Sequence, residues 1–426
     1  MKLHPRAVLP LLQARLEKWP VSVLTGARQT GKTTLVRHLL PEKQESSSVY
    51  FSLDDPDQRL LLAADPVRRL HHGTQLVILD EIQKQPQLLD AVKLLADQEK
   101  GHRFLLLGSS QILLLKQVRE TLAGRATLLE LWPLALVERV YGEPSPLSAL
   151  DRIWQEGKPC LRRMAEKPPP AETARLWRGL AEEHFVWGGY PRLESLTEAH
   201  RRVWLRDFRR TYLERDLADL GRVADLDQFA LAQNLLAIRT AQILSYSEVS
   251  RDLGVAVNTV KRYLRFLEIS YQAYLLRPLF PTTTARLIKS PKLYWTDPGL
   301  ARLLSERMGI SDGPLFDTAV LGELLRWSAW QPEPPSLHFY RTRAGREVDF
   351  VVHDPHALIA IEAKASVKAH RKQARVLSEF LETVELPAMN PNAWRLGLVV
   401  TRGREVEQLA PNVWGIPDWQ LFGPAA

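Results

Sequence analysis

Residues 21–40 read VSVLTGARQTGKTTLVRHLL. The first five residues favour a buried strand and the last six favour a helix. Between them, Gly26–Thr33 matches the phosphate-loop pattern G-x-x-x-x-G-K-[ST] at every fixed position. Glycines let backbone N–H groups curl around phosphate oxygens, and the helix that follows presents its positive end to them. The sequence therefore predicts an ATP site formed by Gly26, Ala27, Arg28, Gln29, Thr30, Gly31, Lys32, Thr33 and Thr34.

Two further segments fit this site. Leu76–Leu79 is a short apolar run that ends in Asp80 and Glu81, so two acids leave the carboxyl end of an expected strand. We expect Thr33 and Asp80 to hold Mg²⁺ and Glu81 to orient or deprotonate the attacking water. After the apolar residues 104–107, Ser109 is expected to contact the γ-phosphate or that water.

The surrounding sequence places this site in a larger α/β protein. Five β-rich runs, which alternate with helical patterns, predict a mainly parallel sheet: 21–25, 49–53, 76–79, 103–107 and 126–131. The chain has 426 residues, 57 Lys+Arg against 49 Asp+Glu and a formal charge of +8, with 45% hydrophobic residues. This composition is that of a folded protein of about three domains. The single cysteine, Cys160, excludes an internal disulfide.

Several segments resemble one family. GARQTGKTT, YFSLDDP, VILDEIQ, LLLGSSQ and LAGRATLLELWPLALVE are similar to the prokaryotic AAA-type ATPases whose core precedes a C-terminal domain of unknown function. FVWGGYPRL, TYLERDL, YWTDPGL and REVDF…IEAK resemble that C-terminal domain. The resemblance implies an ATPase followed by a winged helix and a nuclease-like module.

ATPases of this type usually need a cation that stabilises the charge developing on the γ-phosphate. Arg125, just before the fifth expected strand, is the first candidate, and Arg215, between two acids, is the second. Either arginine could instead form a structural ion pair. If one of them serves a neighbouring subunit, the working form is a homo-oligomer.

The middle of the chain contains an arginine-rich helical segment, residues 201–215. Trp204, Phe208 and Tyr212 are spaced four apart and therefore share one helix face. The arginines are then either a solvated face opposite an aromatic core or a surface that faces DNA.

Residues 245–267 follow the pattern of a helix-turn-helix. Ser245 and Glu248 predict the start of the first helix, Gly254 ends it, and an apolar stripe supports the second helix. Residues 274–280 and 292–295 could pair as a wing, with Arg286, Lys289 and Lys292 near its tip. The residues expected to meet DNA are Asn258, Thr259, Lys261, Arg262, Arg265 and Lys289.

The C-terminal part has its own charged pattern. Asp349 lies in one expected strand, and Glu362 and Lys364 share a face of the next. Together they resemble the PD-(D/E)xK nuclease core, in which the carboxylates would hold Mg²⁺ or Mn²⁺ and the lysine would steady the nucleophile. Glu323 matches the extra acid of the resolvase-like branches, and Gln373 is a further candidate for the site.

These expectations combine into an α/β chain of four parts. They are a P-loop AAA-type ATPase core (1–135), a helical lid or connection (136–225), a winged helix-turn-helix (226–310) and a C-terminal α/β restriction-endonuclease-like domain (311–426). We expect a cytoplasmic ATPase without membrane segments that engages, and in one reading cleaves, duplex or branched DNA. The alternative is an ATP-gated switch in which the winged helix binds protein and the nuclease fold is inactive.

Overall fold

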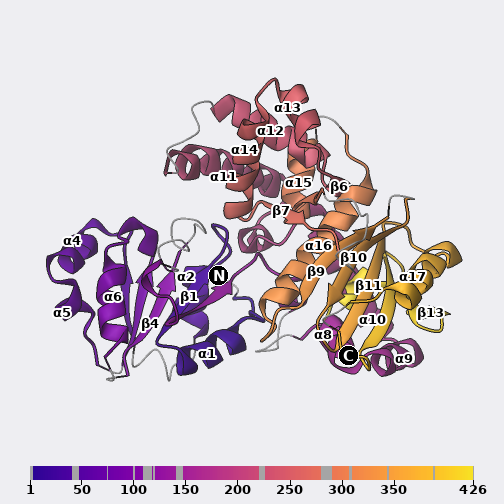
Figure 1. Cartoon of the computed structure of the whole chain (residues 1–426), viewed down its shortest axis with the longest axis horizontal. Helices are drawn as coiled ribbons and strands as arrows, with labels where there is room; N and C mark the ends of the chain where they lie inside the picture. Colours follow the sequence, from indigo (N-terminus) through magenta and orange to yellow (C-terminus); the bar gives the residue numbers. More distant parts are fainter. Residues whose placement is uncertain are drawn as a thin grey trace.

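In the computed structural model (Figure 1), a smaller N-terminal unit adjoins a larger body that contains the rest of the chain. The structure describes residues 3–40, 48–73, 75–98, 101–108, 118, 120–140, 147–219, 226–279, 290–306, 309–342, 345–386 and 389–425, and for 212–219 the backbone only. Within these residues, no helix combines the length and apolar character that a membrane crossing requires.

The N-terminal unit is built on a five-stranded sheet in the order β2-β3-β4-β1-β5, and every pairing in it is parallel. Its strands confirm the five expected from the sequence. They are β1 (Val21–Thr25), β2 (Ser48–Ser52), β3 (Leu76–Asp80), β4 (Arg103–Leu107) and β5 (Ala126–Glu130).

Helices cover both faces of this sheet, so apolar clusters lie on either side of it. This cover explains why β1 and β3 are buried at every position rather than at alternate ones. The helices are α1 (Leu9–Lys18), α2 (Lys32–Thr34), the π-helical η1 (Leu35–Leu39), α4 (Pro56–Ala64), α5 (Pro66–Leu70), η2 (Ile82–Lys84) and α6 (Leu88–Ala96).

A helical segment follows the first sheet. It comprises η3 (Leu136–Arg139), α8 (Ala149–Glu156), α9 (Lys158–Glu166), α10 (Ala171–Trp187), η4 (Pro191–Ser195), α11 (Glu198–Asp219) and α12 (Leu226–Ile238). On α11, the Trp204 and Phe208 rings stack 5.2 Å apart beside Tyr190, which confirms the expected aromatic face for these two residues. The side chain of Tyr212 lies outside the described residues.

Two short helices and a small sheet come next. Ser245 caps α13 (Tyr246–Leu253) by accepting from the Glu248 N–H at 3.4 Å, and Gly254 ends this helix in the left-handed conformation (φ 66°). After the turn comes α14 (Val257–Ile269), which has no side-chain cap. The strands β6 (Gln242–Ile243), β7 (Ala273–Leu276) and β8 (Lys292–Trp295) form an antiparallel sheet in the order β6-β8-β7.

The C-terminal part is a six-stranded mixed sheet in the order β13-β14-β12-β11-β10-β9. Helices α16 and α17 both pack against its strand β11. Its strands are β9 (Ser336–Arg341), β10 (Glu347–His353), β11 (Ala357–Lys364), β12 (Trp394–Thr401), β13 (Glu407–Ala410) and β14 (Val413–Pro417). The helices around it are α15 (Pro298–Ser305), α16 (Asp312–Ala329), α17 (Arg371–Thr383) and α18 (Asp418–Leu421).

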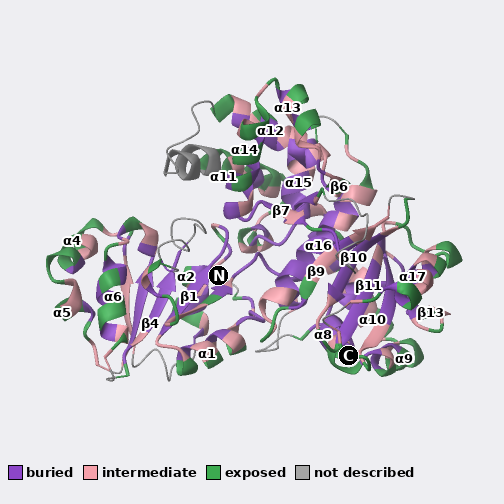
Figure 2. Cartoon of the chain, in the orientation of Figure 1, coloured by how far each residue is buried: buried purple, intermediate pink, exposed green. Residues whose placement is uncertain are grey.

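One hydrophobic cluster runs through the larger body, from Trp132 and Leu136 through the helical segment to Trp419 and Phe422. Figure 2 shows this buried interior continuing from the helices into the C-terminal sheet. The last residues also return to the start of this body, because the Ala149 N–H donates to Gly423 O and the Ala425 N–H donates to Leu147 O.

Candidate functional site

The phosphate loop leaves the carboxyl end of β1 and is shaped by two glycines. Gly26 has φ 150° and Gly31 has φ 93°, values that residues with a side chain rarely adopt. A Cβ atom on Gly26 would lie 2.1 Å from the carbonyl oxygen of Leu131, so the loop passes directly against the end of β5. Glycine at position 26 is therefore required by close backbone contact as well as by conformation.

Lys32 lies inside the curve of this loop. Its Nζ donates to the carbonyl oxygens of Gly26 at 3.0 Å and Ala27 at 2.7 Å, and the side chain is buried. Thr30 closes the loop further by donating its hydroxyl to Ala27 O at 3.0 Å. The ammonium group is thus held at the centre of the loop, where it can neutralise bound phosphates.

Beside the loop, three oxygen groups converge on β3. The hydroxyl groups of Thr33 and Tyr50 both donate to Oδ2 of Asp80, at 2.8 and 2.5 Å, and Oδ1 of Asp80 accepts from the Glu81 N–H. Burial, together with the bond to Asp80, raises the pKa of Tyr50. The structure thus brings together Thr33 and Asp80, as the sequence predicted, and adds Tyr50.

Glu81 has a strained backbone. Its φ of 57° and ψ of 43° lie in the left-handed region, where a residue with a side chain costs on the order of 1–3 kcal/mol. Its carboxylate accepts a hydrogen bond from the Gln83 amide. This strained acid follows Asp80 at the same sheet edge as the phosphate loop.

Arg6 supports the loop from the N-terminal segment, a role that nothing in the local sequence indicated. Its guanidinium donates to Thr30 O and Trp132 O, each at 2.7 Å, and pairs with Glu138 at 3.2 Å. The side chains of Arg6 and Glu138 are both almost fully buried. Arg6 therefore links the phosphate loop to residues 132–138, which follow β5.

Arg125 and the phosphate loop lie at opposite ends of the parallel strands. Arg125 precedes the start of β5, whereas the loop follows the end of β1. Ala126 is level with Val21 at the start of β1, whereas the loop follows Thr25 at its end, about 16 Å away at the rise of a strand. Arg125 is partly exposed and pairs with Asp97. Its position excludes action on the nucleotide of its own subunit. Ser109 and the side chain of Arg215 lie outside the described residues.

In the C-terminal sheet, the hairpin of β10 and β11 brings together the three charged residues expected there. Nζ of Lys364 is 2.8 Å from Glu362 and 3.5 Å from Asp349, and the Ala363 N–H donates to Asp349. Burial raises the pKa of Glu362 to about 7, with a further contribution from the charge of Asp349. Asp349, Glu362 and Lys364 thus form one cluster, defined here as the hairpin cluster.

A second lysine from another sheet enters this cluster. Lys292 on β8 is only 3% exposed, pairs with Glu347 and lies 3.4 Å from Asp349. Lys292 lies at the end of the β7–β8 pair, near the expected wing tip, but its ammonium is buried against the C-terminal sheet. Two ammonium groups thus flank Asp349, where they repel a divalent cation. Within the described residues, no three His, Cys, Asp or Glu side chains are grouped to hold a metal ion. In this structure Asp349 and Glu362 are therefore paired with lysines.

The structure does not bring Glu323 to the hairpin cluster, which corrects its assignment as a metal ligand. Its carboxylate is 2.9 Å from His184 Nε2 and 3.6 Å from Arg326, and it accepts from the Leu136 N–H. Gln373 likewise lies in the first turn of α17, where it accepts from the His370 N–H. The acid of α16 near Asp349 is instead Asp317, whose pKa is raised well above its usual range by burial and then by Asp349.

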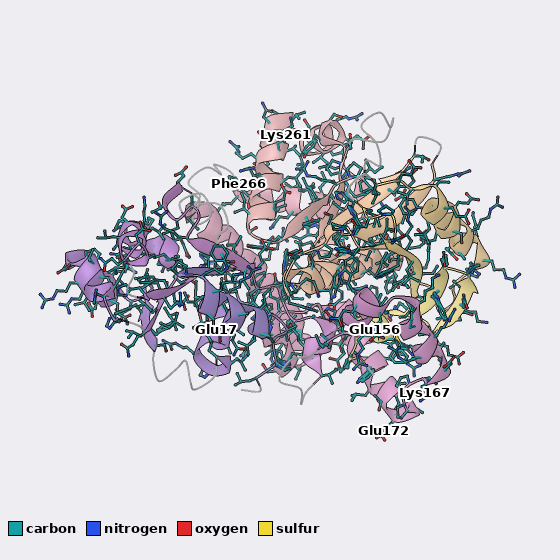
Figure 3. All side chains as sticks on the ribbon, turned by 60° about the horizontal axis from the view of Figure 1, so that its bottom comes forward. Glu17, Glu156, Lys167, Glu172, Lys261 and Phe266 are labelled. Carbon is teal, nitrogen blue, oxygen red and sulfur yellow. The ribbon has the colours of Figure 1, made fainter. Side chains whose placement is uncertain are left out.

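The residues expected to meet DNA form one row on α14. Asn258, Lys261, Arg262 and Arg265 are exposed and Thr259 is half-buried, while Val260 and Leu264 face the core. Lys261 lies at the outer edge of the molecule in Figure 3, and its Nζ is 5.7 Å from the centre of the Tyr246 ring. Lys289 lies outside the described residues.

Three family models match successive parts of the chain. Residues 18–140 match an AAA domain, residues 178–310 match a domain of unknown function (DUF8612), and residues 312–419 match a second one (DUF4143). The first match covers the phosphate loop and Asp80, and the third covers the hairpin cluster.

Two curated relatives, the uncharacterized proteins Rv2008c of Mycobacterium tuberculosis and Mb2031c of Mycobacterium bovis, are each 32% identical over 356 residues. The match covers 83% of this chain and 72% of each relative. Among solved structures, the chain is similar to the ORC2 protein of Aeropyrum pernix in its ADPNP–ADP complexes. The identity is 15%, the coverage is 75% of this chain and 96% of that one, and the TM-score is 0.35.

Proposed function

This chain belongs to the family of the two mycobacterial proteins, and from that premise we propose that it is a Mg²⁺-dependent ATPase whose nucleotide state governs binding to DNA. The observation that carries this proposal is the 2.8 Å contact between Thr33 and Asp80 beside the phosphate loop. A hydroxyl and a carboxylate oxygen suit Mg²⁺, which would neutralise charge on the phosphates.

The remaining steps belong to side chains at the same sheet edge. Lys32 would exchange its bonds to the Gly26 and Ala27 carbonyls for bonds to the β- and γ-phosphates. Glu81 would orient the attacking water and accept its proton, and its strained backbone supports such a role because strain persists where the surrounding structure imposes a geometry.

The DNA-binding part of the proposal rests on residues 226–295. The order α12, β6, α13, α14, β7, β8 fits a winged helix-turn-helix, with α14 as the helix that enters the major groove. Its exposed row of Asn258, Lys261, Arg262 and Arg265 supports this assignment.

The experiment compares ATP hydrolysis by the parent, Lys32→Ala and Glu81→Gln, with and without duplex DNA. Glu81→Gln should bind ATP as the parent does and hydrolyse it at least about 100-fold more slowly, because it keeps the site but loses the base. Lys32→Ala should lose nucleotide binding. Hydrolysis by the parent that does not depend on Glu81 would refute the assigned role, and the absence of DNA binding at low salt would refute the proposed partner.

We propose that Arg125 stabilises the γ-phosphate charge in a neighbouring subunit, because it lies too far from the nucleotide site of its own subunit. Mixing Arg125→Ala with Lys32→Ala subunits tests this assignment. In mixed oligomers, an intact arginine from the Lys32→Ala subunit meets an intact phosphate loop in the Arg125→Ala subunit, so part of the activity should return. A mixture as inactive as its two components would contradict it.

A second candidate function is the ATP-gated switch without nuclease activity. Lys292 favours it, since this buried ammonium lies beside Asp349 where a nuclease would need a metal ion. The discriminating experiment is DNA cleavage in Mg²⁺ or Mn²⁺ by the parent and by Glu362→Ala. Cleavage by the parent that the variant loses would exclude the switch without nuclease activity.

A further inference from the structure

A groove with three arginines lies between α11, α12 and α15. Its volume is about 620 Å³, and its lining includes Arg206, Arg209, Arg210, Asn234, Leu303 and Glu306. Helix α12 contacts both α11 and α14, so the groove belongs to the same helical bundle as the proposed DNA-binding helix.

The arginines of this groove are regularly arranged. Arg202, Arg206 and Arg210 are all exposed and follow one another at intervals of four residues, which places them about 6 Å apart along one side of α11. The opposite side of this helix is the aromatic face that packs into the core. The arrangement is therefore a straight cationic row on a fixed support.

The guanidinium of Arg209 is already oriented toward α12. It donates to Gln233 Oε1 at 3.1 Å and to Ala230 O at 2.8 Å. Among the described residues that line the groove, the one acid is Glu306, which pairs with Arg202 at 2.7 Å and Arg206 at 3.8 Å. Three arginines and one acid thus line the described part of the groove.

We propose that this arginine groove is a second contact surface for the phosphate backbone of a nucleic acid. Guanidinium groups bind phosphates with two parallel hydrogen bonds, and a row at regular spacing suits a polyanion with regularly repeated charges. Carboxylates can bind the same guanidinium groups, so an acidic peptide is the competitor in the test. The proposal rests on the proposed function and extends the DNA contact beyond α14.

The test measures the binding of a fluorescein-labelled DNA duplex by anisotropy over a range of salt concentrations. Arg206→Ala/Arg210→Ala should weaken binding at least about tenfold and reduce the slope of log K against log salt by about 1.8, the value for two phosphate contacts. Glu306→Gln should bind about fivefold more tightly, since it removes one nearby negative charge.

A control is Arg346→Ala/Arg375→Ala, which also removes two exposed arginines, in this case a pair that shares Glu379 on another part of the surface. This control should bind DNA as the parent does. Equal effects of the two double variants, or tighter binding of a decaglutamate peptide than of DNA in the groove, would overturn the proposal. A parent that binds DNA through Lys261 and Arg262 alone would overturn the groove but leave the proposed function intact, whereas a parent that binds no DNA would refute both.

Discussion

Replacing Lys292 with Met tests how the hairpin cluster is held together. Methionine keeps an unbranched side chain and removes the charge, so Glu347 and Asp349 lose a buried partner. The pKa of Lys292 is raised by the neighbouring Asp349 and Glu347 despite the opposing effect of burial, so the parent keeps this ammonium charged at neutral pH. Removing one partner of a buried ion pair costs about 3–5 kcal/mol.

The expected loss lies at the lower end of that range, about 3 kcal/mol, because both acids keep another partner. Glu347 also pairs with Arg341 at 3.1 Å, and Asp349 lies 3.5 Å from Lys364. Urea unfolding followed by circular dichroism measures this loss. In a double-mutant cycle, adding Asp349→Asn should recover part of it, since that change removes a carboxylate that has lost one of its two ammonium partners.

Arg375→Met is the control for this measurement, because it breaks an exposed ion pair and should leave the unfolding free energy unchanged. A loss below about 1 kcal/mol in Lys292→Met would refute the reasoning, because a buried ion pair should cost more. Mn²⁺ binding by Lys292→Met but not by the parent would show in addition that the ammonium excludes a cation.

Three further predictions concern other contacts. Gly26→Ala should lose ATP binding, and its free energy of unfolding should fall by more than about 3 kcal/mol, because the new Cβ would meet Leu131 O at 2.1 Å. Nucleotide binding and urea unfolding measure the two effects. A variant that binds ATP normally would contradict the prediction. Tyr50→Phe should destabilise the nucleotide-free protein by about 1.5 kcal/mol through loss of the bond to Asp80, and an unchanged urea midpoint would count against that bond. Burial raises the pKa of Glu362 from 4.5 to about 7, so the folded protein binds this proton more tightly than the unfolded chain does. Its unfolding free energy should therefore fall by about 2–3 kcal/mol as pH rises from 4.5 to 7 and then level off, whereas a Glu362→Gln variant with the same dependence between pH 5 and 8 would disprove the assignment.

The ATP site could be predicted because its parts are local. Gly26, Lys32 and Thr33 lie in one loop, and Asp80 follows a strand that the apolar pattern predicts, so their meeting needs only a parallel sheet. The roles of Arg6 and Tyr50 could not be predicted, because each reaches the site through the folding of a distant segment and no fixed position of the phosphate-loop pattern refers to it.

The hairpin cluster could be predicted only in part from sequence patterns. A period of two placed Glu362 and Lys364 on one face, and the hairpin placed Asp349 beside them. The choice between Asp317 and Glu323 needed the orientation of α16, since residues six apart point about 240° apart around a helix. Lys292 meets Asp349 across two sheets and 57 positions, a contact that no local pattern predicts.

The return of the last residues to the start of the larger body has a practical meaning. Leu147 and Ala149 hydrogen bond to Ala425 and Gly423, so the two ends of residues 147–425 lie side by side. A body whose two ends meet tolerates circular permutation. Its ends could be joined by a short linker and new ends opened in an exposed turn of the C-terminal sheet. Such a permutant would test whether the larger body folds without the ATPase unit.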